Sequence, residues 1–85
     1  MPTTLDTIQP GNRCRVTGFT GSGAIKRRLM DMGLIRRSAI EVLRVAPLGD
    51  PIEITVRGYQ LSLRREEAAL VEVETESEAG KDAES

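Results

Sequence analysis

Two adjacent segments of the chain alternate apolar and polar residues, and this is the clearest pattern in the sequence. The segments are Ile52-Glu53-Ile54-Thr55-Val56 and Tyr59-Gln60-Leu61-Ser62-Leu63. Alternation with a period of two predicts half-buried strands. If Arg57-Gly58 forms a two-residue turn, the hairpin buries three facing pairs on one face: Val56 with Tyr59, Ile54 with Leu61, and Ile52 with Leu63. A slip of one residue would expose half of the apolar side chains, so the register is strongly determined.

A further strand is predicted before this hairpin, at Ala39 to Val45, where β-branched residues are frequent. Its apolar parity switches between Val42 and Leu43, which is typical of a sharp bend or a bulge at a barrel corner. The following segment, Pro47-Leu48-Gly49-Asp50-Pro51, contains two prolines that cannot donate ladder hydrogen bonds. It is therefore predicted to be a loop.

The first and last predicted strands flank these elements. Arg13 to Phe19 places Cys14 and Val16 on the inner face, and Leu70 to Glu74 does the same for Val71 and Val73. The total is five short strands. Such a set avoids long exposed edges by curling into a small barrel.

One segment, Ser22 to Met32, has the pattern of a helix instead. It contains no proline, begins after glycine and serine, and ends at Gly33. At about 100° per residue, Ile25, Leu29 and Met32 share the face expected to cover the barrel. Lys26, Arg27 and Asp31 point away from the barrel. Met30 lies on the same side as they do, so either its side chain is partly exposed or the helix packs against other elements on two sides.

Length and composition limit the function. A chain of 85 residues forms one domain at most, and its 39% hydrophobic and 29% charged content is ordinary for a soluble globular protein. No apolar run is long enough to span a bilayer, and residues 1 to 10 lack the features of a signal peptide. A cytoplasmic location is expected.

The charge is distributed unevenly along the chain. Residues 13 to 65 hold eleven Arg and Lys against four acids, a net +7, whereas residues 66 to 85 hold eight acids and Lys81, a net −7. Large apolar residues also disappear after Glu72. We therefore expect a folded domain over residues 1–74 and a disordered acidic tail over residues 75–85.

Several kinds of chemistry are disfavoured by the residues present. The chain has no histidine, and the acids of its basic body are scattered over different elements, so no catalytic residues, resident metal site or cofactor are predicted. Cys14 is expected to be a small core residue. The glycine-rich segment Gly18 to Gly23 lacks the Gly-Lys-Ser/Thr ending of a nucleotide-binding P-loop, and we interpret it as a permissive loop.

The basic residues Lys26-Arg27-Arg28 and Arg36-Arg37 leave three interpretations open. They are a solvated surface, a protein-binding surface, or a nucleic-acid-binding surface. Nucleic acid is the least favoured, because Phe19 and Tyr59 are the only aromatic residues available for stacking on bases, and Tyr59 is assigned to the core. A small divalent-metal carrier is a further alternative function.

Several short motifs together resemble those of the FeoA (ferrous iron transport protein A) family across about residues 5 to 74. They are Leu5, Ile8, Pro10-Gly11, Val16, Gly18, Arg28-Leu29-Met30-Asp31-Met32-Gly33-Leu34, Pro47-Leu48-Gly49-Asp50-Pro51-Ile52 and Gly58-Tyr59-Gln60-Leu61-Ser62-Leu63-Arg64. The resemblance implies a mainly β fold: a five-stranded SH3-like barrel with one short helix between its first and second strands. The chain departs from the family at Arg37-Ser38, where the family often has Pro-Gly after the helix.

The resemblance also implies a cytosolic accessory of FeoB, the membrane permease with a GTP-binding domain, and no enzymatic activity. The resemblance further implies that the chain contacts the membrane only through its partner, binds no small-molecule substrate and is able to self-associate. We expect the contact surface to comprise basic residues and the apolar residues beside them: Lys26, Arg27, Met30, Leu34, Ile35, Arg36 and Arg37. The acidic tail is expected to compete with the partner for this surface.

Overall fold

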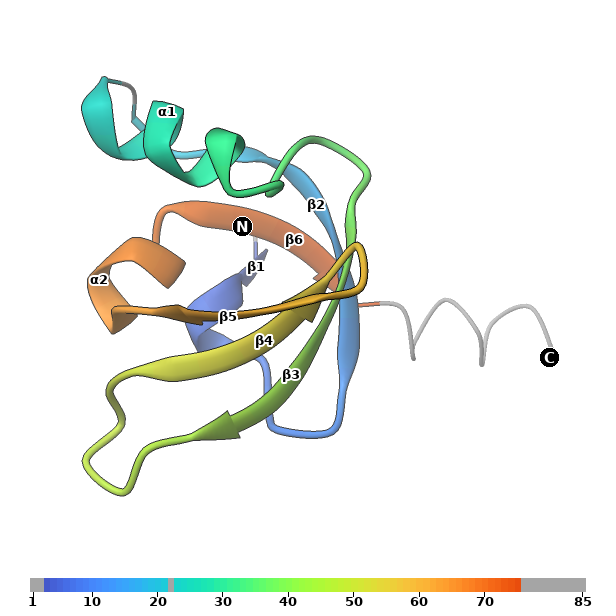
Figure 1. The fold of residues 1–85 in the computed structure, drawn as a ribbon, viewed down its shortest axis with the longest axis vertical. Helices are drawn as coiled ribbons and strands as arrows, with labels where there is room; N and C mark the ends of the chain where they lie inside the picture. The colour runs from blue at the N-terminus through green and yellow to red at the C-terminus, as the bar shows by residue number, and fades with distance from the viewer. Residues whose placement is uncertain (1–2, 22, 76–85) are drawn as a thin grey trace, which may run out of the picture.

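The computed structural model describes residues 3–21 and 23–75, which form an antiparallel sheet with short helices (Figure 1). The strands are β1 (Thr3–Thr4), β2 (Arg13–Phe19), β3 (Ala39–Val45), β4 (Ile52–Val56), β5 (Tyr59–Leu63) and β6 (Val71–Thr75). The helices are the 3-10 helix η1 (Leu5–Thr7), α1 (Ala24–Asp31) and α2 (Arg65–Ala68). The mainly β prediction is confirmed.

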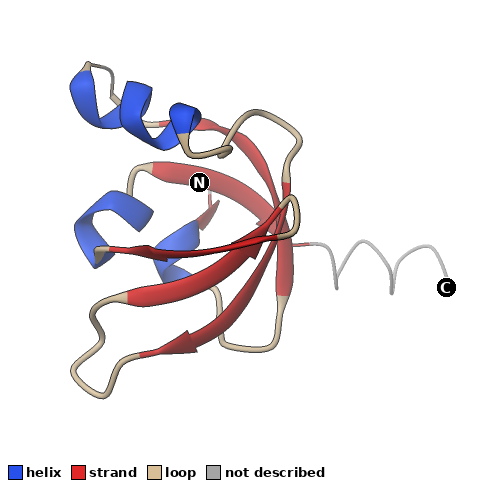
Figure 2. Cartoon of the chain, in the orientation of Figure 1, coloured by secondary structure: helices blue, strands red, loops and turns tan. Residues whose placement is uncertain are grey.

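The strands are hydrogen-bonded in the order β1-β6-β2-β3-β4-β5. The sheet curls around its apolar face, and in the view of Figure 2 the helices lie together on one side of it. Five of the six strands correspond to those predicted. The sixth, β1, was missed because its two residues are too short to show an alternation, and it is defined only by pairing with β6.

The predicted hairpin is confirmed in its register. Val56 is opposite Tyr59, Ile54 opposite Leu61, and Ile52 opposite Leu63. Arg57 and Gly58 form the two-residue turn with φ values of 54° and 83°. Positive φ at both positions defines the turn type whose twist matches that of paired strands.

One assignment within the hairpin was wrong, because Tyr59 is 69% exposed and does not belong to the core. It occupies an inward-facing position, but β5 is the last strand of the sheet and Tyr59 is its first residue. Among the described residues, no strand lies beyond β5 to cover it. Leu61 is half-buried and Leu63 is fully buried, so burial of the inward positions increases along β5.

The bend predicted in β3 is present. The register between β3 and β4 shifts between Val42 and Arg44, so one extra residue opposes the partner strand there. Such an irregularity increases the local twist and helps to curl the sheet. A second shift, between β2 and β6 at Val16 and Gly18, gave no signal in the apolar pattern.

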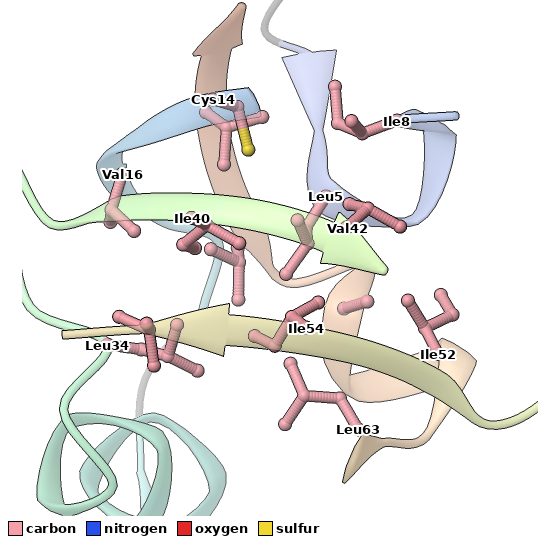
Figure 3. Packing of buried hydrophobic residues seen from close by; sticks show 14 of the residues in the cluster. Leu5, Ile8, Cys14, Val16, Leu34, Ile40, Val42, Ile52, Ile54 and Leu63 are labelled. Carbon is pink, nitrogen blue, oxygen red and sulfur yellow. The ribbon is translucent and has the colours of Figure 1, made fainter. Parts of the chain in front are cut away.

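The core is a single cluster on the inner face of the curled sheet (Figure 3). Cys14, Val16, Val71 and Val73 point inward as predicted. Residues from outside the sheet complete the cluster: Leu5, Ile8, Leu29, Leu34 and Ala68.

Helix α1 ends as its sequence predicts. Met32 is the C-cap, and Gly33 follows with φ of 106°, a conformation that L side chains rarely adopt. The N–H of Gly33 donates to Met30 O at 3.0 Å, and the N–H of Leu34 donates to Leu29 O at 3.0 Å. These two bonds make a Schellman motif, which turns the chain back toward the core.

The face that α1 presents to the barrel is narrower than expected. Leu29 is fully buried and Met32 packs against the core, but Ile25 is 42% exposed. The helix begins at Ala24, and the predicted first residue, Ser22, lies outside the described residues. At the other end of the chain, β6 includes Thr75, and the rest of the predicted tail, 76–85, also lies outside them.

Candidate partner-binding surface

Helix α1 presents three of the predicted contact residues together. Lys26, Arg27 and Met30 line one surface depression with Gly23 and Asp31. Met30 is 42% exposed although it is large and apolar. In the part of the chain that the structure describes, neither Lys26 nor Arg27 forms an ion pair. We call Lys26, Arg27 and Met30 the α1 surface.

Arg28, which follows these residues, has a structural role instead. Its guanidinium forms an ion pair with the carboxylate of Glu67 in α2, a residue that is only 5% exposed. The other carboxylate oxygen of Glu67 accepts a hydrogen bond from the N–H of Arg64 at 2.9 Å. Glu67 therefore caps α2 and connects it to α1. Sequence reasoning missed this pair because 39 residues separate its members.

Leu34 is not available to a partner, which corrects its assignment to the contact surface. Its side chain is completely buried. The Schellman motif explains this, because the residue after the C′ glycine commonly packs back against the last turn of the helix. Leu34 therefore contributes to stability, and the neighbouring Ile35, 37% exposed, is the apolar residue that remains at the surface.

The last two predicted residues, Arg36 and Arg37, are exposed and lie against β2. The Nε of Arg36 donates to Thr17 O at 3.1 Å, and the N–H of Arg37 donates to Val16 O at 2.7 Å. We call Ile35, Arg36 and Arg37 the loop surface. None of its residues lines the depression that contains Lys26, Arg27 and Met30, so we describe the predicted surface in two parts.

Arg37 adopts an unfavourable backbone conformation. The N–H of Ser38 donates to Ile35 O at 3.0 Å, which closes a turn over residues 35–38, and Arg37 is its third residue with φ of 75°. A turn with positive φ at this position favours glycine.

We expect Arg37→Gly to stabilise the protein by roughly 0.5–1 kcal/mol, since relief of the left-handed strain exceeds the entropy that glycine adds to the unfolded chain. Chemical denaturation measures the change. Arg36→Gly is the matched control and is expected to destabilise, because it removes a side chain bonded to β2. If the backbone of Arg37 is not strained, both Arg37→Gly and Arg36→Gly should lose stability.

The two most exposed large apolar residues among those that the structure describes were not predicted to be exposed. Leu48 is 95% exposed and Tyr59 is 69% exposed. Leu48 stands between Pro47 and Gly49 in a short loop, where a large side chain has little to pack on, so the sequence contained a signal for its exposure.

Within residues 3–21 and 23–75, no three acidic or cysteine side chains gather into a group able to hold a metal ion. No helix in these ranges is long and apolar enough to cross a bilayer. Neither observation identifies a partner.

Comparison with known proteins identifies close relatives. The family model described as "FeoA domain" matches residues 3–75. A Porphyromonas gingivalis protein named Fe(2+) transport protein A/Fe(2+) transporter FeoB fusion protein is 36% identical over 70 residues. These residues are 82% of this chain but only 8% of the fusion protein, so the chain spans a small part of that relative's length.

Solved structures agree with the fold. The FeoA protein from Chlorobium tepidum is 44% identical with a TM-score of 0.80, covering 86% of this chain and 70% of that one. A FeoA from Stenotrophomonas maltophilia, described as a prokaryotic SH3 domain protein complexed with zinc, is 25% identical with a TM-score of 0.75, covering 85% and 89% of the two chains. The curled sheet is therefore an SH3-like fold, as the sequence predicted.

Proposed function

Because the chain belongs to the FeoA-domain family, we propose that it is a cytosolic accessory of ferrous iron uptake that binds and modulates a FeoB-type permease. The observation that carries the proposal is the P. gingivalis relative, in which Fe(2+) transport protein A and the transporter FeoB form one polypeptide. Joining two proteins in one chain raises their effective concentration for each other, which favours partners that work in contact.

The structure supports contact through the α1 surface. Lys26 and Arg27 have no ion-pair partner among the described residues, and Met30 is an exposed apolar side chain between them and the loop that follows. An exposed apolar residue surrounded by charges is a typical centre of a protein interface. The loop surface supplies two more arginines and Ile35.

Such an accessory acts by preferring one conformation of its partner. Equal affinity for two states of the permease would shift neither, so modulation requires contacts that differ between the states. The FeoA from S. maltophilia has been put forward as a ferrous iron transport activating factor, which agrees with a role of this kind. In this proposal iron(II) is the cargo of the permease, and the chain holds no catalytic group.

The test is binding of the chain to the purified permease in lipid nanodiscs. We expect Lys26→Glu, Arg27→Glu and Met30→Asp, combined, to weaken binding by about tenfold or more, as loss of an interface centre does. A matched control lowers the net charge by the same amount and replaces one exposed apolar residue elsewhere. It combines Arg13→Glu, Arg44→Glu and Leu48→Asp. Unchanged affinity of the folded α1 variant would refute the contact surface, and no binding by the unmodified chain would refute the partner.

A further inference from the structure

The acidic C-terminal tail begins close to the loop surface. Residues 76–85 lie outside the described part of the chain, but they continue from Thr75, which is opposite Cys14 in the sheet. The next residue of β2 is Arg15, and its guanidinium donates to Arg37 O at 3.5 Å. In Figure 1 the end of β6, the connection from α1 to β3 and the turn between β4 and β5 lie on the same side of the barrel. One strand, β2, therefore separates the start of the tail from the loop surface.

Arg57 extends the loop surface toward the turn between β4 and β5. It is exposed, and its Cδ would be 3.6 Å from a Cβ placed on Gly33, the glycine from which the loop starts. Within residues 3–21 and 23–75, none of Arg36, Arg37 and Arg57 forms an ion pair. This side of the molecule thus presents three exposed guanidinium groups that lack a counter-charge among the described residues.

The acidic residues on the neighbouring strands face other groups. The carboxylate of Glu41 is 3.9 Å from the Nε of Arg13, and the two form an ion pair. Glu74 lies directly opposite Arg15 across β6 and β2. Glu72 accepts a hydrogen bond at 3.1 Å from the hydroxyl of the threonine that follows β2. The positive charge of the three arginines is therefore not cancelled by these acids.

The tail has the complementary charge and sufficient length. It carries four carboxylates and one cation: Glu76, Glu78, Asp82, Glu84 and Lys81. Fully extended, residues 76–85 span up to roughly 33 Å, whereas adjacent strands are only about 5 Å apart. A segment tethered this closely has an effective concentration on the order of millimolar at the surface beside it. A free partner of equal affinity for the surface lacks this advantage.

The α1 surface is a less favourable place for the tail. Asp31 lines its depression beside Lys26 and Arg27, so the carboxylates of the tail would meet a like charge there. In Figure 1 the first turns of α1 also lie on the opposite side of the molecule from the end of β6. The structure thus narrows the expected competition by the tail from the whole predicted surface to its loop part.

We propose that residues 76–85 bind the loop surface and Arg57 of their own chain and thereby shield this surface from partners. Pairs of exposed charges are individually weak, so the contact forms and breaks repeatedly and is weakened by salt. A partner can bind the shielded surface only while the tail is released, which raises its apparent Kd. The contact itself is independent of the permease, whereas its effect on permease binding rests on the proposed function.

The test places a nitroxide on the tail of the isotopically labelled full chain, at Ala79→Cys. Cys14 is fully buried, so the label attaches to the new cysteine. We expect the nitroxide to broaden the amide signals of the loop surface and Arg57 more than those of the α1 surface. A matched control carries the same nitroxide on a tail whose carboxylates are replaced by amides, and its broadening at the loop surface should be about threefold weaker or less. The control combines Glu76→Gln, Glu78→Gln, Asp82→Asn and Glu84→Gln.

Three results would overturn the proposal. They are equal broadening by the acidic and the neutral tail, broadening centred on the α1 surface, and broadening that persists after the three arginines are replaced by glutamine. A mixture of nitroxide-bearing chains with isotopically labelled chains that lack the nitroxide detects contact between molecules. Broadening in this mixture as strong as in the single chain would identify a second copy as the binding site of the tail and would also refute the proposal.

Permease binding measures the consequence of the contact. The neutral-tail chain, without the nitroxide, should bind the permease in nanodiscs about threefold more tightly than the unmodified chain. In the matched background Arg36→Gln, Arg37→Gln and Arg57→Gln, the same tail change should leave the affinity unaltered. Equal affinity of the two tails in the otherwise unmodified chain would overturn the shielding. No binding by either chain would refute the proposed function instead, and the nitroxide experiment would still decide the contact.

Discussion

Replacing Leu34 by alanine is expected to destabilise the protein by about 3 kcal/mol, the usual cost of removing a fully buried leucine. The residue is completely buried and follows the glycine that ends α1, so the cavity would open where the helix meets the barrel. For a domain of this size the melting temperature should fall by more than about 10 °C. Thermal and chemical denaturation measure both quantities.

Ile35→Ala is the matched control for this experiment. Ile35 is the next residue and 37% of it is exposed, so its truncation should cost less than about 1 kcal/mol. If the two variants lose similar stability, the burial of Leu34 described above is wrong. If the loop surface takes part in the interface, Ile35→Ala should bind the permease more weakly than the unmodified chain does. Leu34→Ala, measured at a temperature where both variants are folded, should bind it normally.

The ion pair between Arg28 and Glu67 should give the second large effect. Arg28→Met keeps most of the side-chain volume but leaves a buried carboxylate whose one remaining partner among the described residues is the Arg64 N–H. We expect a loss of about 2 kcal/mol, below the range for fully buried pairs because the side chain of Arg28 is 62% exposed. Glu67→Gln, which still accepts from Arg64, should cost only about 1 kcal/mol.

A double-mutant cycle separates the pair from its surroundings. The variant carrying both Arg28→Met and Glu67→Gln should be more stable than the sum of the two single effects predicts, by roughly 1 kcal/mol or more. Strictly additive losses would mean that the ion pair contributes no coupling between α1 and α2. Arg44→Met with Glu53→Gln is a suitable control pair, since both members lie on the outer surface and are expected to couple weakly.

The elements that the sequence predicted correctly are those with local causes. Alternation determines which face of β4 is buried, the two-residue turn determines the register with β5, and Gly33 ends α1 through its own backbone preference. In each case the relevant residues lie within a few positions of one another. Periodicity and turn chemistry are therefore sufficient to predict them.

Two of the assignments that failed, those of Tyr59 and Arg28, depend on distant parts of the chain. Tyr59 follows the inward pattern, but it is exposed because β5 is the edge of the sheet that the described strands form. Leu34 was grouped with basic neighbours, although the chain reversal after α1 places it in the core. Arg28 was counted as a surface cation, and only the fold shows that its partner is Glu67. The alternation of apolar and polar residues within one segment carries no information on which other elements pack against it.

The pairing of β1 with β6 has a consequence for how the chain folds during synthesis. Thr3 lies opposite Val73, and β6 occupies the sheet position between β1 and β2. Among the described strands, the last to leave the ribosome therefore belongs between the first two. Until β6 is synthesised, β2 has a neighbouring strand on one side only. The pairing of β6 with β1 and β2 joins residues from nearly opposite ends of the described chain. Such long-range pairing slows folding relative to domains built from local contacts.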